Sequence, residues 1–290
     1  MPNGGTSKDN VPIHGRELGR RLRAAQKAAR LTGLELSRAI GASNAQVSRM
    51  LTGVNEPALA NAAAILALCR IVGPERDEIL DLCHPRHHSA VLRLSDGTQW
   101  DAFLYHAKQA IRLIEYQPLM IPWLVQDQAY SGAYHTVPDQ QHRPWSQKLN
   151  HGPAIDLLAG LERTELLVHE FALRAPIVNH SERSAQMHKL LTVSSRRKVT
   201  LRVIPQTWAI PITALSGFTI LEYQQKRTLL YREDPTGAVF VDDPNQVAVY
   251  GKILDRLRRA ALTGPGSRFL IEQIRDEPAP VPEPEDPFQN

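Results

Sequence analysis

Polar side chains suited to reading DNA bases occur in a short run near the amino end of the chain. Asn44, Ala45, Gln46 and Arg49 supply two amides, a methyl group and a guanidinium within six residues. Amide and guanidinium groups pair with base edges in the major groove, and a methyl group contacts the thymine methyl. We expect these four residues to contact bases from one exposed face of a helix.

The flanking sequence predicts that helix and a second one before it. Thr32-x-x-Glu35 and Ser43-x-x-Gln46 are both capping-box patterns, in which each side chain bonds the backbone of the first helical turn. Gly41 lies between them and can adopt the positive φ of a helix end. Apolar residues at helical spacing would close a small core between the two helices; they are Leu36, Ile40, Val47 and Met50. The sequence therefore predicts a helix-turn-helix.

Positive charge is concentrated on this region. Between Gly15 and Thr52 there are eight Lys or Arg and two Glu, a net charge of +6, against +4 for the whole chain. A duplex binder needs such a surplus to neutralise phosphates, although a solvated arginine face on one helix is also common. The predicted phosphate contacts are Thr32, Arg38, Ser43, Ser48, Arg20 and Arg21.

Residues 31–53 resemble the Cro and phage-repressor (XRE-type) family of DNA-binding domains. The matching residues are Leu31, Thr32, Glu35, Leu36, Gly41, Ser43, Val47, Ser48, Arg49, Thr52 and Gly53. Gly33 stands where that family has a phosphate-binding Gln, and Leu34 replaces a polar residue. The resemblance implies a domain of five helices, and apolar residues at helical spacing predict one helix before the motif and two after Pro57.

The rest of the chain predicts an α+β domain with a small sheet. Helices are expected at residues 100–116, 145–162 and 244–262, and a short last helix through Ile274 is expected to be capped by Ser267. β-Branched and aromatic runs predict strands at residues 165–173, 199–205, 217–223, 228–233 and 237–243. The Asp234-Pro235-Thr236-Gly237 break indicates a hairpin between the last two runs.

An apolar segment between the first two of these helices is the candidate ligand or partner site. Its prolines forbid a continuous helix and hold large side chains in extended or turned backbone. The residues proposed for this site are Tyr116, Pro118, Pro122, Trp123, Gln126 and Tyr130. A place in the hydrophobic core is the favoured alternative, because prolines and aromatic residues also occur in ordinary interiors.

This second half resembles the domain of unknown function that follows the helix-turn-helix in many regulators of high-GC, morphologically complex bacteria. The matching stretches are Glu115–Leu119, Val203–Pro205, Gly217–Leu221, Asp242–Pro244 and Leu254–Leu262. Trp123 and Asp127 depart from the family pattern, which has Gly and Thr there. The resemblance implies a transcription regulator and, for some members, a small partner protein in an antitoxin-like arrangement.

Composition indicates a soluble globular protein of about two domains. The chain has 290 residues, of which 42% are hydrophobic, and no apolar run approaches the roughly 20 residues needed to cross a bilayer. The amino-terminal residues lack the apolar core of a secretion signal. We therefore expect a cytoplasmic, nucleoid-associated protein.

No residue pattern predicts catalysis, a cofactor or a metal site. Cys83, His84, His87 and His88 have no standard zinc-finger spacing, and a hydrophilic linker explains them more simply. Cys69 and Cys83 are expected to be buried reduced thiols rather than a redox pair. Scattered groups that could meet for acid–base work are more simply structural; they are His151, His169, His180, His188, Glu162, Glu165 and Glu170.

The sequence thus predicts a dimeric DNA-binding regulator that reads a pseudo-palindromic operator, with recognition helices about 34 Å apart. Its expected parts are a five-helix domain at residues 12–84, a linker at 85–99, an α+β regulatory domain at 100–275 and a disordered acidic, proline-rich tail at 276–290. Alternatively, the tail would shield a basic surface of the protein when DNA is absent.

The regulator would respond to a small-molecule effector or a small partner protein. The alternative function is an antitoxin-like adaptor that sequesters a small partner protein and autoregulates its own operon.

Overall fold

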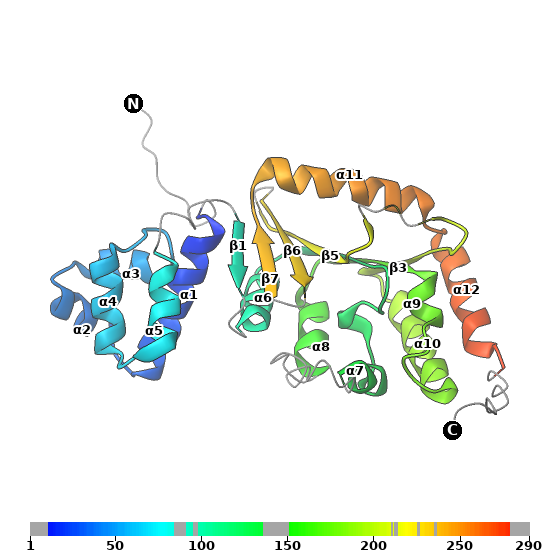
Figure 1. Ribbon diagram of the computed structural model, residues 1–290, viewed down its shortest axis with the longest axis horizontal. Coiled ribbons are helices and arrows are strands. Elements are labelled where there is room, and N and C mark those ends of the chain that lie inside the picture. The colour runs from blue at the N-terminus through cyan, green and yellow to red at the C-terminus, as the bar shows by residue number, and fades with distance from the viewer. Residues whose placement is uncertain are drawn as a thin grey trace, which may run out of the picture. The chain divides into compact units, whose positions relative to one another are not determined.

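The computed structural model describes residues 11–83, 91–94, 98–135, 151–209, 211, 214–224, 227–234 and 237–278 (Figure 1). The chain forms two compact units. Unit 1 consists of Met1–Gln109 and Ile220–Gly251, and unit 2 consists of Ala110–Thr219 and Lys252–Asn290. None of the helices in the described residues is both long and apolar enough to cross a bilayer.

The first part of unit 1 is a bundle of five helices, which confirms the predicted helix-turn-helix domain. The helices are α1 (Ile13–Ala28), α2 (Gly33–Ile40), α3 (Asn44–Leu51), α4 (Leu59–Leu68) and α5 (Gly73–Asp81). Their apolar stripes meet in a common core that includes Leu18, Leu22, Leu36, Val47 and Ile65, all fully buried. Burial of these stripes, rather than helix propensity, stabilises helices as short as α2 and α3.

Helix α1 crosses the end of α3 at very short range. A Cβ added to Gly19 would lie 2.9 Å from the carbonyl carbon of Thr52, and Gly53 approaches Gly15 in the same way. Gly53 also has a positive φ of 74°. Glycine at these positions lets the two backbones touch, so the orientation of α1 fixes that of α3.

The remaining described elements of unit 1 are strands together with α6 and the first part of another helix. They are β1 (Val91–Leu94), α6 (Gln99–Ala107), the last residues of β5 (Phe218–Glu222), β6 (Thr228–Asp234), β7 (Gly237–Val241) and the first residues of α11 (Pro244–Ala260). The strand order is β1-β7-β6-β5, and Tyr231 pairs with Phe240 across the hairpin. Phe103 of α6 contacts the Tyr231 ring at a centroid distance of 4.4 Å, so an aromatic cluster joins α6 to the strands.

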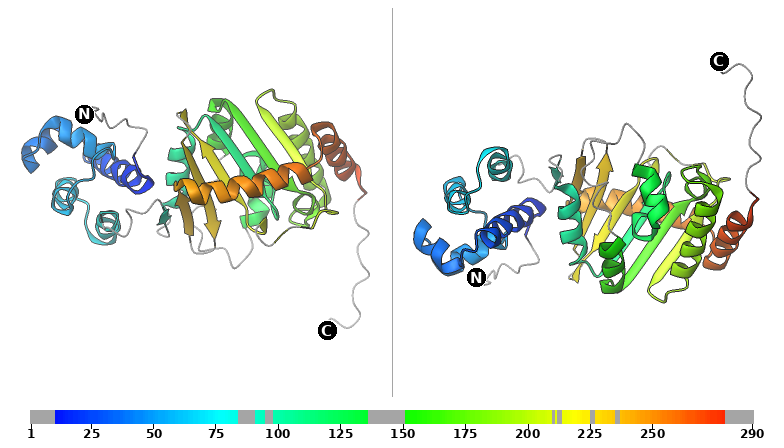
Figure 2. Two further views of the ribbon diagram at one scale, coloured as in Figure 1. Left: turned by 90° about the horizontal axis from the view of Figure 1, so that it is seen from above. Right: turned by 90° about the horizontal axis from the view of Figure 1, so that it is seen from below.

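Unit 2 is built on parallel strands. These are β2 (Arg112–Gln117), β3 (Arg163–His169) and β4 (Val199–Ile204), of which β3 pairs in parallel with both β2 and β4. The first residues of β5 also belong to this unit, and the strand order is β5-β2-β3-β4. The helical elements are η3 (Trp123–Val125), α7 (Gln128–His135), α8 (His151–Gly160), α9 (Glu170–Arg174), α10 (His180–Ser194), the later part of α11 (Pro244–Ala260) and α12 (Gly264–Asp276). Helix α11 lies on one face of β2–β4 and α8 and α10 lie on the other (Figure 2).

The fold class is confirmed as a helical amino-terminal domain followed by an α+β region, but two strands were not predicted. The helix expected at residues 100–116 ends at Ala107, and residues 112–117 form β2. Strand β2 has four consecutive buried residues. A strand buried on both faces reads as a continuous apolar run and loses its period of two, so it mimics a buried helix. Strand β1 lies in the expected linker.

Two local features of the carboxyl end also differ from the sequence prediction. Helix α12 begins at Gly264 and is capped by Thr263, whose hydroxyl accepts from the Gly266 N–H. Ser267 is buried instead, and its hydroxyl accepts from the Val203 N–H at 2.9 Å. The helix includes Asp276, and Glu277 pairs with Arg174, so order extends into the predicted tail. Residues 279–290 lie outside the described residues.

The compact units do not follow the predicted domain boundaries. Strand β1 and helix α6 belong to unit 1 together with the five helices, and α1 contacts β1. The boundaries at residues 84 and 100 therefore stay a prediction.

Candidate nucleic-acid interface

The two predicted capping boxes are both formed. Thr32 Oγ1 accepts from the Glu35 N–H while Glu35 Oε2 accepts from the Thr32 N–H. Ser43 and Gln46 make the same reciprocal pair at the start of α3. Gly41 ends α2 in the left-handed conformation with φ 69°. These contacts fix the first residue of α3 and therefore which of its side chains face outward.

Helix α3 presents a polar outer face and an apolar inner face. Val47 and Met50 are buried against the bundle, as expected. The outer residues named as DNA contacts are all exposed: Asn44, Ala45, Gln46, Ser48 and Arg49. The face that sequence spacing assigned to bases is thus open over the length of α3, as a major-groove helix requires.

Gln46 has a restricted role on that face. Its side-chain oxygen accepts from the Ser43 N–H at 2.8 Å, which uses one of the two lone pairs and holds the amide toward the start of α3. A bidentate contact to adenine needs both an acceptor and a donor on the same amide. Asn44 and Arg49 therefore have the fuller capacity for base reading.

The polar residues predicted to bind phosphate also differ in whether their hydrogen-bond donors are free to contact DNA. Thr32 is exposed, but its hydroxyl donates to Glu35 Oε2 at 2.7 Å, so the donor is used locally. Ser43 accepts from Gln46 and keeps its own proton for a phosphate. Ser48 and Arg38 are exposed. Gly33, at the position of the missing Gln, leaves room for Asn44, since a Cβ there would lie 2.9 Å from Asn44 Oδ1.

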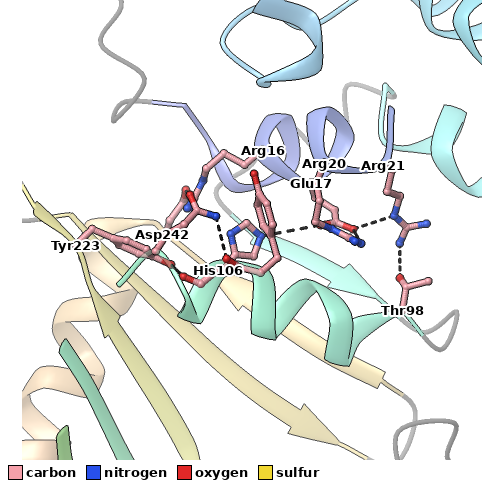
Figure 3. A network of polar contacts seen from close by, with 10 residues as sticks. Arg16, Glu17, Arg20, Arg21, Thr98, His106, Tyr223 and Asp242 are labelled. Atoms are coloured by element: carbon pink, nitrogen blue, oxygen red, sulfur yellow. Dashed lines mark hydrogen bonds and ion pairs between the residues drawn. The ribbon is translucent and has the colours of Figure 1, made fainter. Parts of the chain in front are cut away.

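Arg20 and Arg21, two of the predicted phosphate contacts, are bound within the protein rather than exposed, and their contact with DNA stays a prediction. Both guanidinium groups turn inward to Glu17, which is completely buried, and Arg21 is 6% exposed (Figure 3). Arg16 is also buried. A buried carboxylate requires cationic partners, and here it takes two arginines of its own helix. The sequence contained a signal for these ion pairs. Glu17 is the one acidic residue among the α1 arginines, and it lies three positions before Arg20 and four before Arg21.

The cations of the bundle that remain exposed lie elsewhere. In the described part of residues 15–52 they are Arg23, Lys27, Arg30, Arg38 and Arg49. Arg23 also donates to the Leu51 carbonyl at 3.3 Å, which ties α1 to the end of α3. These five residues are the exposed positive charges that this part of the chain offers to a polyanion.

The proposed ligand segment is mainly interior. Tyr116 is fully buried and donates its hydroxyl proton to the Ala214 carbonyl, and burial raises its pKa. Gln126 donates to the Ile121 carbonyl, and the Tyr130 hydroxyl accepts from the Ile121 N–H. Pro118 and Pro122 are buried, and Trp123 is half-buried. The segment is held by its own hydrogen bonds, which favours the core alternative.

Four of the scattered acidic and histidine residues make structural contacts. Glu165 accepts from Arg112 and Arg258, and Glu170 accepts from Arg174. His169 caps α9 and His180 bonds the Glu277 carbonyl. Among the described residues no cluster of three or more potential metal ligands occurs. His84, His87, His88 and the side chain of His151 lie outside the described part.

The two cysteines are free thiols with raised pKa values. Cys69 is buried, while Cys83 is only partly buried, which corrects the expectation of two buried thiols. Burial, assisted by Glu56, raises the pKa of Cys83 to about 11. Both thiols are therefore protonated and weakly reactive at neutral pH.

Comparisons with known proteins agree with this architecture. No curated protein matches the chain. A structure of TrmBL2, an archaeal chromatin protein, aligns with a TM-score of 0.31 and 12% identity. The alignment covers 64% of this chain and 61% of that one, so this chain spans less than two thirds of its length; a likeness this weak supports no inference. A helix-turn-helix domain model matches residues 17–81, which supports DNA binding. The model of a domain of unknown function (DUF5753) matches residues 100–273, more than half of the chain, and the chain therefore belongs to the DUF5753 family.

Proposed function

We propose that this protein is a sequence-specific regulator that binds double-stranded DNA through α3. The observation that carries the proposal is the polar face of a rigidly capped helix, with Asn44, Ser48 and Arg49 exposed and Val47 buried behind them. Helix α3 would lie in the major groove, Asn44, Ala45 and Arg49 would contact bases, and Ser43 and Arg38 would contact phosphates. No enzymatic activity is part of the proposal.

The regulator acts as a homodimer on a two-fold symmetric operator. One α3 spans only a few base pairs, and a pair of such helices about 34 Å apart reads two successive major grooves. The elements outside the five-helix bundle control DNA affinity, in response to a small-molecule effector or a small partner protein. This assignment places the protein in the cytoplasm with the nucleoid.

The proposal is tested by selecting binding sequences for the full chain from random duplexes and measuring affinity at several salt concentrations. We expect an enriched sequence with two-fold symmetry and affinity that falls steeply with salt. Arg49→Ala should cost about 1–3 kcal/mol and relax preference at one base pair of each half-site. Arg76→Ala, which removes a half-buried arginine of α5 that pairs with Asp77, is the matched control. Absence of any enriched, salt-sensitive sequence would reject the proposal.

An antitoxin-like adaptor is the second candidate, because unit 2 exposes large apolar side chains. Phe171 of α9 and Phe269 of α12 are 53% and 61% exposed, and the two helices contact each other. Exposed aromatic residues of this kind are typical of protein interfaces. A stable, stoichiometric protein partner in a pull-down that is lost on Phe269→Ser would favour the adaptor, and an operator affinity shifted by a small molecule would favour the effector-controlled regulator.

A further inference from the structure

Helix α1 carries a buried cluster of charged groups that reaches well beyond the five helices. The α1 cluster consists of Arg16, Glu17, Arg20, Arg21, Thr98, His106, Tyr223, Arg227 and Asp242, all in unit 1. Figure 3 labels all of these residues except Arg227. They come from α1, the residue before α6, α6 itself, the residue after β5, the residue before β6 and the residue after β7. Base or phosphate binding does not explain such an arrangement.

One arm of the cluster links α1 to the start of α6. Glu17 accepts from Arg20 Nε at 2.7 Å and from Arg21 Nε at 2.8 Å, and Arg21 donates in turn to Thr98 Oγ1 at 2.6 Å. Glu78 of α5 lies 3.8 Å from Arg21 at the exposed margin. His106 of α6 lies 4.0 Å from Glu17. Charge-assisted hydrogen bonds of this kind are short and directional, so this arm fixes α1 beside α6.

The second arm links α1 to the strands. Asp242 lies 3.4 Å from Arg16 and 3.6 Å from Arg227, and Arg227 also donates to the Val11 carbonyl at 2.5 Å. The guanidinium carbons of Arg16 and Arg227 lie 5.7 and 5.8 Å from the centroid of the Tyr223 ring, within cation–π range. The Asp242 carboxylate therefore contacts two guanidinium groups from different parts of the chain, buried Arg16 and partly buried Arg227.

Positive charge exceeds negative charge in this cluster. It contains four arginines and two carboxylates, and its histidine adds no charge, because burial and then Arg16 hold the pKa of His106 well below its usual range. Burial and repulsion from Arg16 lower the pKa of Arg227 to about 10. The two guanidinium groups at Asp242 therefore repel each other, and the charge of Asp242 between them offsets that repulsion.

We infer that the α1 cluster fixes the orientation of α1, and through it of α3, relative to β6 and β7, and that Asp242 is the residue on which this linkage depends. The inference rests on the proposed function, because the linkage matters to DNA binding only if α3 is the recognition helix. Since α1 touches the end of α3 at Gly19, any change in the orientation of α1 also changes the orientation of the recognition helix. When the cluster opens, the helix-turn-helix can reorient. Binding of the two half-sites by one dimer then gives a smaller gain in affinity over binding of a single half-site.

The test uses the full chain with Asp242→Asn, which removes the negative charge that Asp242 presents to Arg16 and Arg227. Amide hydrogen exchange in residues 13–28 should become about tenfold faster while exchange in β2–β4 stays unchanged. Affinity for a two-half-site operator should fall about tenfold, and affinity for a single half-site should change less than about twofold. Asp77→Asn, the same chemical change at a side chain 74% exposed on α5, is the control and should behave as wild type.

Thr98→Val tests the first arm with less risk to folding. It removes one of the acceptors of Arg21 and keeps the shape of the side chain, so we expect the same pattern with changes of about threefold. Unchanged exchange in both variants, or faster exchange with an unchanged preference for two half-sites, overturns the inference. A wild-type chain that binds no DNA would instead refute the proposed function, and the exchange measurement would still judge the linkage.

Discussion

Single residues of α3 have separate tasks, because one part of the polar face holds the helix start and another part is free. Asn44 is exposed, whereas Gln46 is committed to the capping box. We predict that Asn44→Ala leaves thermal stability unchanged and costs about 1–3 kcal/mol of operator binding. Ser43→Ala should instead destabilise the fold by about 0.5–2 kcal/mol, because it removes the cap. Thermal unfolding and operator titration of both variants measure these effects, and equal losses of stability would contradict the division.

Glu165 of unit 2 predicts a specific pH dependence of stability. Burial would raise its pKa, but the hydrogen bonds and charges of Arg258 and Arg112 outweigh burial and hold the pKa below its ordinary value of 4.5. Because the folded-state pKa is lowered, the stabilisation is complete above the unfolded pKa and is lost as pH falls through the folded one.

Glu165→Gln should therefore cost about 1–3 kcal/mol at neutral pH, and the cost should shrink on acidification below about pH 4. Urea unfolding of both proteins across this range measures it. Glu272→Gln, on α12 and outside this ion pair, is the control. A cost that is constant with pH would show that the charge of Glu165 does not stabilise the fold.

The residues that could be predicted from sequence are those whose partners are local. Both capping boxes join positions three apart, so the pattern itself contains the whole interaction. Arg21 could not be placed this way, because Thr98, one of its partners, lies 77 positions along the chain. A helical arginine with no recognised partner is read as exposed, and only tertiary contacts reverse that reading.

Among elements, the crossing of α1 and α3 is more sensitive than the turn between α2 and α3. At Gly41 an added Cβ meets nothing within 4 Å, so Gly41→Ala costs only the strain of a left-handed residue, about 1–2 kcal/mol. At Gly19 an added Cβ meets the backbone of Thr52 and Gly53, which cannot rotate away. We predict a larger loss for Gly19→Ala, about 3 kcal/mol, and weaker DNA binding as well. Thermal unfolding of the two variants checks the order, and a smaller loss for Gly19→Ala would refute it.

The elements found from sequence follow the same rule as the residues. Strands β5 to β7 were predicted, because turns and β-branched runs mark their limits in the sequence itself. Strand β2 was assigned to a helix, since its burial on both faces depends on neighbours that the sequence does not reveal. Strand β1 has only four residues and pairs with β7, almost 150 positions later, so no local signal indicated it.

At the scale of the whole molecule, the salt dependence of DNA binding tests which arginines face the duplex. Five exposed Lys or Arg in residues 15–52 would give a slope of log K against log salt of no more than about −4.5 for one half-site, and about −9 for a two-fold operator. If Arg16, Arg20 and Arg21 of the α1 cluster also contacted phosphate, the single-site slope would approach about −7. Titration of a half-site and a full operator at several salt concentrations distinguishes these cases. Lys27→Ala, at an exposed position, should reduce the magnitude of the half-site slope by about 0.9 if that residue contacts phosphate. A slope near −7 would mean that the α1 cluster opens when DNA binds.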